Sequence, residues 1–279
     1  MAQNNSIIGD LSRRRFIATS AAVSASLALA GTGSWPAFAD PANDNCGGKD
    51  DNVSLWKDVK DATPAAPHPN TKVDYPLNPK NPQPKDGYAV HTGGPEFAEW
   101  DWLVLPLVRA TGIECHKCWT PDEMLNLWPW AANWANDSAS HLAGQDWVLA
   151  INSGNTHKVP QLHIHVTKFE HNIRTALTAA AKTSKPATTA ADWSNHTVAV
   201  DDKLYRWLQR KSIDHQLFAD VRNYVAKSDK AMVDQIIAVV QVDPTNPGAG
   251  YYVLNSDKAL SAHKPFGVDY VENLLYRKH

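Results

Sequence analysis

The stretch QLHIHV, residues 161–166, places two histidines at the spacing of a β-strand. Side chains two positions apart in a strand lie on one face, so His163 and His165 should face together, with apolar side chains on the opposite face. The stretch follows a polar loop that begins at Asn152 and Ser153. Two imidazoles in this setting can hold a metal ion, pack on a sheet or act on a phosphate.

The metal and packing interpretations both need something more than the two histidines. A metal site requires at least a third ligand, commonly a carboxylate. Glu170 and His171 follow the strand, but Glu170 should face away from His165 if the strand continues to it. Plain packing is ordinary for one histidine and less so for two beside a polar loop.

The third interpretation makes His163 a nucleophile that attacks phosphorus. Imidazole is nucleophilic near neutral pH because much of it is unprotonated there. The nucleotidyl-imidazole that forms is labile, so water can complete a hydrolysis. Donors must neutralise the charge that grows on the non-bridging oxygens. The candidate side chains for phosphate binding are Gln161, His165, Asn152, Ser153 and Lys158.

The elements that should position this stretch alternate between strands and helices without regular βαβ order. The expected strands are 87–93 and 99–108 as a hairpin, 146–153, 161–169, several within 197–210, and 234–242 with 250–256 as an antiparallel pair. The expected helices after the histidines are 171–182 and 214–228. This mixture predicts the α+β class with an antiparallel sheet.

A further helix has a well-marked start before the histidines. Thr120 as N-cap, Pro121 in the first helical position and Glu123 form a capping box. We expect this helix to run toward Gly144 and to bend at Pro129, which cannot donate to the carbonyl four residues back.

Tryptophans crowd that helix, at positions 128, 130 and 134. Packing against the sheet explains them, and so does a wall for an apolar ligand.

The N-terminus resembles a twin-arginine export signal. "SRRRFIA", residues 12–18, precedes a weakly apolar run and the sequence AFAD, which favours cleavage after Ala39. The alternative is a basic, disordered start. We therefore expect residues 1–39 to be a signal peptide, either cleaved or kept as an anchor, and the protein to work in the periplasm or at the periplasmic face of the inner membrane.

Residues 40–86 carry many prolines among polar side chains, which predicts an extended segment wrapped over the surface, with a short helical piece at 53–60. The remaining residues, 87–279, should form the folded domain. The net charge of −2 gives no reason to expect nucleic-acid binding.

The cysteines are Cys46, Cys115 and Cys118. The CHKC sequence at 115–118 has no second pair to complete a zinc site, and the βαβ context of a thioredoxin-like motif is lacking. One disulfide formed in an oxidising compartment, with one thiol left over, is the favoured interpretation.

QLHIHV resembles the histidine-triad motif, in which the central polar position is the nucleophile. Together with "LVLP", "TGIE" and "LAINS" in this order, the sequence is similar to the CDP-diacylglycerol pyrophosphatase family, a divergent branch of the histidine-triad superfamily. The similarity runs from about residue 87 to residue 257. It implies a histidine-triad-like antiparallel sheet with flanking helices, enlarged within a single chain whose strands at 197–210 and 235–255 supply a second half.

Position by position, the resemblance implies that His163 is the nucleophile and that His165 contacts the phosphate. Gln161 occupies the first triad position, and Asn152 and Ser153 match a polar pair at the end of the preceding strand. The sequence departs from the expected pattern at Val159 and Pro160, where more polar residues are expected, and at His157, where a basic residue is expected.

The reaction implied is hydrolysis of CDP-diacylglycerol to phosphatidate and CMP, without a cofactor or metal. Two alternatives stay open: a histidine-triad hydrolase or nucleotidyl transferase acting on a soluble nucleotide, and a non-catalytic periplasmic protein that binds nucleotide or lipid. A lipid substrate would also give the tryptophan-rich stretch 119–134 a role in shielding acyl chains or touching the membrane. The superfamily is compatible with a homo-oligomer.

Overall fold

The structure is a computed structural model that describes residues 46–67, 71–74, 87–93, 101–120, 123 and 125–276. The expected signal peptide, residues 1–39, and the capping-box residue Pro121 lie outside these ranges.

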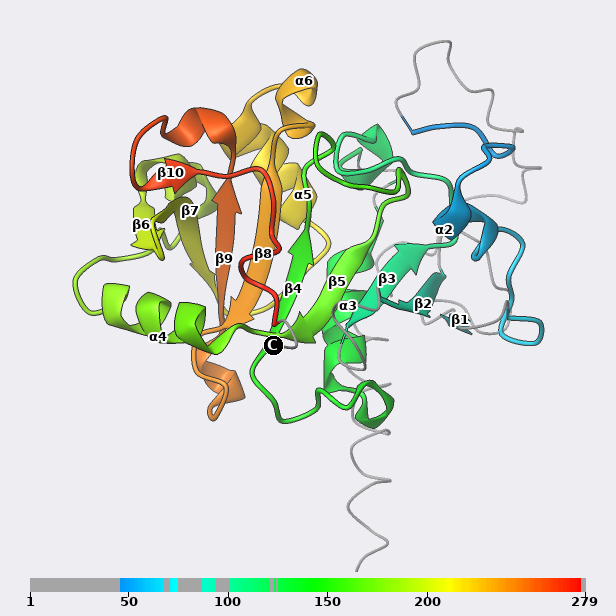
Figure 1. Ribbon diagram of the computed structural model, residues 1–279, viewed down its shortest axis with the longest axis horizontal. Helices are drawn as coiled ribbons and strands as arrows, with labels where there is room; N and C mark the ends of the chain where they lie inside the picture. Colours follow the sequence, from blue (N-terminus) through cyan, green and yellow to red (C-terminus); the bar gives the residue numbers. More distant parts are fainter. Residues whose placement is uncertain are drawn as a thin grey trace, which may run out of the picture.

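All strands of the described residues join one sheet that runs across the molecule (Figure 1). In spatial order they are β1 (Thr71–Asp74), β2 (Tyr88–Thr92), β3 (Trp102–Pro106), β5 (Ile164–Lys168), β4 (Trp147–Ile151), β8 (Ile236–Gln241), β9 (Tyr251–Ser256), β7 (Lys203–Arg210) and β10 (Phe266–Gly267), with β6 (Thr197–Val200) on β7. Neighbours are antiparallel except β10 and β7, which are parallel. The α+β prediction with an antiparallel sheet is confirmed, as are the β2–β3 hairpin and the β8–β9 pair.

The helices of the described residues are short. They are α2 (Ser54–Lys57), α3 (Leu127–Asn136), α4 (His171–Ala180), α5 (Leu217–Asp220), a π-helical turn (Val221–Ala226) and α6 (Asp229–Met232), with 3₁₀ turns at His116–Cys118, Ser138–Ser140, Ala190–Asn195, Pro247–Ala249 and Lys258–Leu260. The helices expected at 171–182 and 214–228 are confirmed as α4 and as α5 with its π-helical continuation. No helix in the described part of the chain has the length and apolar character needed to cross a membrane.

The helix expected from Thr120 to Gly144 is wrong in its extent, because α3 covers only Leu127–Asn136. Pro129 lies in its first turn, where a backbone N–H has no acceptor within the helix, so there is no earlier turn for it to bend. Gly144 adopts a φ of +77° in a later turn rather than ending this helix.

The capping box is replaced by a local contact. The Glu123 carboxylate lies 3.0 Å from His116 Nε2, and the Thr120 N–H donates to the His116 carbonyl at 2.9 Å. Glu123 therefore stabilises a turn that begins four residues before Thr120.

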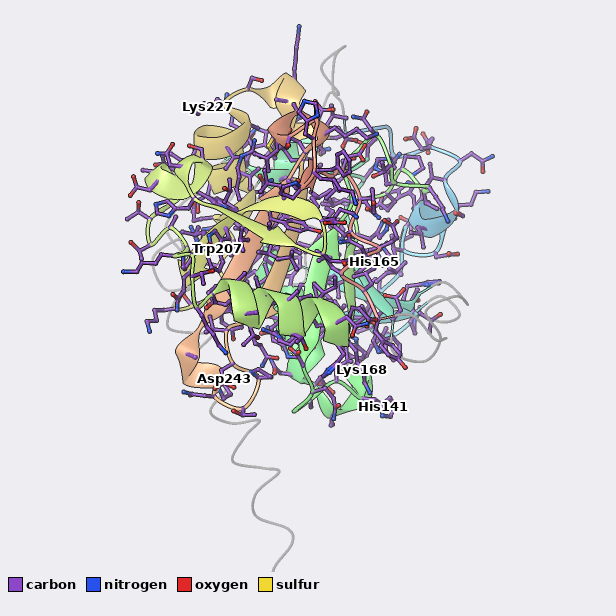
Figure 2. The ribbon with its side chains drawn as sticks, turned by 60° about the vertical axis from the view of Figure 1, so that its left-hand side comes forward. His141, His165, Lys168, Trp207, Lys227 and Asp243 are labelled. Carbon is purple, nitrogen blue, oxygen red and sulfur yellow. A yellow bond between two sulfur atoms is a disulfide. The ribbon has the colours of Figure 1, made fainter. Side chains whose placement is uncertain are left out.

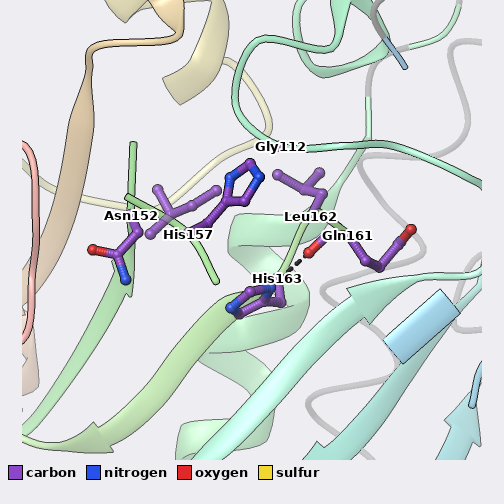
Figure 3. Close-up of a pocket in the computed structure, with 7 residues that line it drawn as sticks. Gly112, Asn152, His157, Gln161, Leu162 and His163 are labelled. Atoms are coloured by element: carbon purple, nitrogen blue, oxygen red, sulfur yellow. Dashed lines mark hydrogen bonds between the residues drawn. The ribbon is translucent and has the colours of Figure 1, made fainter. Parts of the chain in front are cut away.

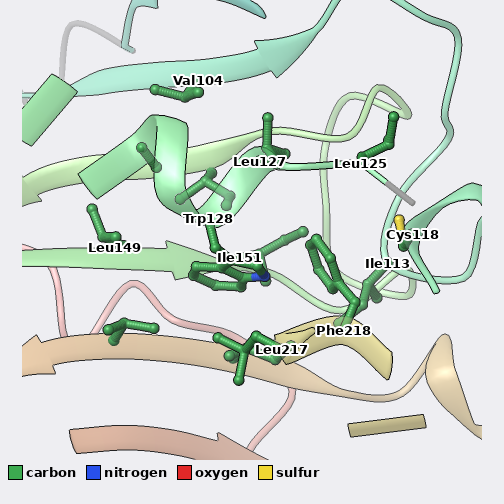
Figure 4. Packing of buried hydrophobic residues seen from close by; sticks show 14 of the residues in the cluster. Val104, Ile113, Cys118, Leu125, Leu127, Trp128, Leu149, Ile151, Leu217 and Phe218 are labelled. Carbon is green, nitrogen blue, oxygen red and sulfur yellow. The ribbon is translucent and has the colours of Figure 1, made fainter. Parts of the chain in front are cut away.

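One face of the sheet is covered by α3 and carries the largest core cluster. Trp128, Trp130 and Trp134 belong to this cluster and are at most 4% exposed. Trp128 packs on Phe218 with ring centroids 5.4 Å apart (Figure 4), and Trp130 stacks on Tyr88 at 5.3 Å. The three tryptophans thus pack against the sheet, which favours the first interpretation over a ligand wall or membrane contact.

The opposite face carries two separate apolar clusters. One gathers around α2 on β1, β2 and β3, and the other lies under α4 and the C-terminal segment on β4 and β6–β9. His165 lies between them, because its neighbours across β5 are Leu103 of the first cluster and Ala150 of the second. Figure 2 labels His165 toward the right of the view and Trp207, which belongs to the second cluster, toward the left.

The proline-rich segment is more ordered than a surface loop where it is described. Leu55 and Trp56 of α2 are buried, and β1 adds an edge strand that the sequence did not predict. A disulfide joins Cys46 to Cys115, and Cys118 is a buried free cysteine. The prediction of one disulfide and one leftover thiol is confirmed.

Candidate active site

A small hollow opens where the loop between β4 and β5 leaves and rejoins the sheet (Figure 3). Its empty space, which includes open solvent, is about 190 Å³. Its lining residues are Gly112, Ile151, Asn152, His157, Gln161, Leu162 and His163. Because β4 and β5 are antiparallel neighbours, the end of one strand and the start of the next bring Asn152 and His163 to the same edge.

His163 stands directly before β5, and its ring is held by the backbone. Its Nδ1 lies 2.6 Å from the carbonyl oxygen of Gln161, so Nδ1 carries the hydrogen and donates it (Figure 3). The other nitrogen, Nε2, then carries the lone pair, and no described residue hydrogen-bonds to it.

Burial, with smaller contributions from the neighbouring His165 and His157, lowers the pKa of His163 to about 3, although the hydrogen bond to the Gln161 carbonyl opposes this shift. The ring is therefore neutral at the pH of any cellular compartment.

His165 has a different partner. Its Nδ1 lies 3.4 Å from Oδ1 of Asp101, a carboxylate that is 2% exposed. The rings of His163 and His165 meet edge to face, with centroids 5.1 Å apart. The two imidazoles thus differ sharply, one held by a carbonyl and the other by a carboxylate.

Asp101 was not identified from the sequence. Its Oδ2 is buried and has no hydrogen-bond partner among the described residues, and a Cβ on Gly93 would lie 1.9 Å from this atom. The available signal was a lone carboxylate between two tryptophans, at the start of an otherwise apolar strand. A buried carboxylate needs a partner, and no partner is close in sequence.

Gln161 lines the hollow, but its amide is engaged with the protein. Its Oε1 accepts from Arg109 Nη1 at 3.0 Å, and its Nε2 donates to the Val108 carbonyl at 3.4 Å. Arg109 is 6% exposed and is the second residue that sequence reasoning missed. Its signal was a single arginine in the apolar stretch that follows β3.

Asn152 also lines the hollow and is tied to the C-terminal segment. Its Oδ1 accepts from the Val271 N–H at 2.9 Å, and its Nδ2 donates to Glu272 Oε1 at 3.1 Å. The last turns of the chain thus form one wall beside the site, which the sequence did not predict.

His165 does not line the hollow, and neither do the remaining candidates, Ser153 and Lys158. Ser153 is fully buried, with its hydroxyl 3.0 Å from Thr156 Oγ1, and Lys158 is exposed on the loop. The hollow contains His157 instead. Burial lowers the pKa of His157, while Glu114 raises it and Arg109 lowers it.

Within the described ranges, no group of three or more His, Cys, Asp and Glu side chains is arranged to hold a metal ion. Glu170 is the residue before α4, and its backbone N–H donates to Leu274 O.

Comparison with known proteins gives one match. The family model described as CDP-diacylglycerol pyrophosphatase matches residues 50–271, which is most of the chain and includes Asp101, Asn152 and both histidines. No curated protein matches the sequence significantly.

Proposed function

Because the chain belongs to the CDP-diacylglycerol pyrophosphatase family, a family of hydrolases, we propose that it cleaves CDP-diacylglycerol through a nucleotidyl intermediate on His163. The products are phosphatidate and CMP. The observation that carries the mechanism is the 2.6 Å contact between His163 Nδ1 and the Gln161 carbonyl, which places the hydrogen on Nδ1 and leaves the lone pair on Nε2.

In the first step, Nε2 of His163 forms a bond to the phosphorus of the cytidylyl group. The bond from that phosphorus to the bridging oxygen breaks, and phosphatidate leaves with the electron pair. The imidazole ring gains positive charge, which the Gln161 carbonyl stabilises through the Nδ1 hydrogen. In the second step, water attacks the same phosphorus and releases a proton to solvent. The N–P bond breaks with its electron pair returning to Nε2, so CMP leaves and the ring is neutral again.

His165 is the best-placed group to stabilise charge on the phosphate. The Asp101 carboxylate lies 3.4 Å from its Nδ1 and orients this ring, which lies beside the nucleophile. The two rings therefore differ in their partners: a carbonyl accepts from the nucleophile, and a carboxylate contacts its neighbour.

The other phosphate-binding candidates differ in whether they line the hollow. Asn152 and Gln161 line the hollow, although their amides bind Glu272 and Arg109. Lys158 and Ser153 would have to act from outside it. The empty space of about 190 Å³ is continuous with open solvent, so a bound substrate would extend beyond the hollow.

The fold is consistent with a histidine-triad-like sheet enlarged within one chain. The pairing of β4 with β8 joins a site-bearing half to a second half built from β6–β9, as the resemblance implies. A homo-oligomer remains a prediction.

We also propose that the protein is exported by the twin-arginine route and acts at the periplasmic face of the inner membrane. The buried Cys46–Cys115 disulfide supports an oxidising compartment. Cell fractionation of the full-length protein and of a variant with Arg13 and Arg14 changed to Lys tests this, and equal periplasmic amounts of both would contradict it.

The activity is tested by measuring CMP and phosphatidate release from CDP-diacylglycerol in mixed micelles, with and without chelator. We expect equal rates under both conditions, because protein side chains hold the phosphates. Diadenosine polyphosphates and other soluble dinucleotides are assayed in parallel. Faster cleavage of these would favour the alternative of a histidine-triad hydrolase or nucleotidyl transferase that acts on a soluble nucleotide, and binding without CMP release would favour a non-catalytic protein.

A further inference from the structure

The turn formed by residues 46–51 lies against the back of the active site, although it is over a hundred residues from His163 in sequence. Cys46 anchors it to Cys115 through the disulfide, and both sulfurs are buried. Gly47 has a φ of +77°, and a Cβ there would lie 2.5 Å from Asp51 Oδ2 and 2.9 Å from Arg109 Cζ. Only glycine therefore lets the turn approach the guanidinium this closely.

Arg109 connects the turn to the loop that carries the nucleophile. Its Nε and Nη2 donate to Asp51 Oδ2 at 2.9 and 2.8 Å. Its Nη1 donates to the Pro160 carbonyl at 2.5 Å and to Gln161 Oε1 at 3.0 Å. A planar guanidinium held on one edge by a carboxylate fixes the acceptors on its other edge.

The contacts form a continuous path to the reacting ring. Asp51 holds Arg109, Arg109 holds Pro160 and Gln161, and the Gln161 carbonyl accepts from His163 Nδ1. We propose that Asp51 and Arg109 are positioning residues for His163, and that the Cys46–Cys115 disulfide keeps Asp51 in place. This inference rests on the proposed function in assigning His163 as the nucleophile.

The disulfide matters because 69 residues separate its two cysteines. Without it, the turn would have to order itself against Arg109 at the cost of its own chain entropy. The free Cys118 should not exchange with this disulfide, because burial raises the pKa of its thiol well above the usual value and keeps the thiol protonated.

Asp51→Asn tests the pair, with Asp50→Asn as the matched control. Asp51 is 35% exposed at its side chain, so the substitution is tolerated, and Asp50 is 97% exposed and contacts Lys60. We expect Asp51→Asn to lower kcat about tenfold with KM within about twofold, since small misplacements of a reacting group act on the chemical step. Asp50→Asn should match the wild type.

A second readout needs no substrate. In ¹⁵N-histidine spectra, wild-type His163 should show a single Nδ1–H tautomer, fixed by the contact with Gln161. It should not titrate from pH 5 to 8, because burial lowers its pKa. Asp51→Asn should mix the two tautomers. An unchanged His163 spectrum together with an unchanged kcat would overturn the proposal. A spectral change in a protein without CMP release would uphold the positioning role and reject the proposed function instead.

Cys46→Ser tests the anchor. It should lower kcat about as much as Asp51→Asn, by about tenfold, and the double variant should be no worse than either single one, because both interrupt one path. Additive losses would show that the disulfide acts on kcat by a route other than Asp51. A Cys46→Ser enzyme with wild-type kcat and His163 spectrum would show that the disulfide serves stability alone. Either result would overturn the proposed role of the disulfide.

Discussion

Two buried polar clusters, one in each half of the sheet, differ in how completely they are hydrogen-bonded. In the C-terminal half, Arg206 donates to Asn255 and Asp257, and Gln235 bonds both Asn255 and Asp257. None of these four side chains has a buried polar atom without a partner among the described residues.

The cluster around the histidines is different. Asp101 Oδ2 is buried without a partner in the described part of the chain, and His163 presents a lone pair at Nε2. A hydrogen-bonded network with no open positions stabilises the fold. Buried donors and acceptors without partners cost stability, and a bound ligand can supply the missing partners. Unpartnered buried atoms also occur in the C-terminal half, at Gln241 Oε1, Trp207 Nε1 and Asn273 Oδ1. The site is distinguished by an open carboxylate beside a pair of histidines, not by an open position alone.

The largest expected effect is the loss of the nucleophile. His163→Ala should reduce CMP release by at least about 10³-fold, the scale seen when a covalent nucleophile is removed, with a melting temperature near that of the wild type. Turnover is measured under saturating CDP-diacylglycerol, with circular dichroism to confirm folding. Substantial turnover in the folded variant would remove the mechanism.

The next effect concerns the partner of His165. Asp101→Asn keeps the shape of the side chain but removes the negative charge 3.4 Å from the ring, so kcat should fall by about 10²-fold. Stability should be unchanged or higher, because a buried carboxylate with an unsatisfied oxygen is replaced by a neutral amide. A variant with wild-type kcat would show that the carboxylate only packs beside His165.

A change in the fully hydrogen-bonded cluster around Asp257 should lower the stability of the fold and leave kcat unchanged. Asp257→Ala leaves Arg206 without its ion-pair partner and should destabilise the fold by about 3 kcal/mol, while kcat per folded molecule stays constant. Denaturant unfolding and active-enzyme assays measure the two quantities. A loss of kcat as large as that of Asp101→Asn would break the distinction between the clusters.

The smallest effect is on acid stability. The pKa of His163 falls from 6.5 to about 3 on folding, so the unfolded chain binds a proton in this range and the folded protein does not. Stability should therefore decline as the pH falls from about 6.5 toward 3, and His163→Gln should weaken that decline. Unfolding curves at pH 7 and pH 4.5 check this, and an identical pH dependence in both proteins would contradict it.

Sequence reasoning succeeded where local patterns determine structure. The buried strands β4, β8 and β9 are visible as apolar runs, and β5 with the histidine pair at its start is visible as strict alternation. The start of α3 was missed because Glu123 contacts His116 rather than capping a helix at Thr120.

The supporting residues could not be found in this way because their partners are distant. Asp101 is 64 residues from His165, and Arg109 is 58 residues from Asp51 and 52 from Gln161. Such pairs become visible only once the sheet order and the disulfide fix which loops meet.

The central claim is tested most directly by trapping the intermediate. The protein is mixed with CDP-diacylglycerol labelled in the CMP phosphorus, quenched in denaturant at alkaline pH within one turnover, digested and mapped by mass spectrometry. The account predicts an acid-labile CMP adduct on the peptide that contains His163 and none on His163→Ala. Release of CMP within that turnover, with no labelled peptide in the active protein, would contradict it.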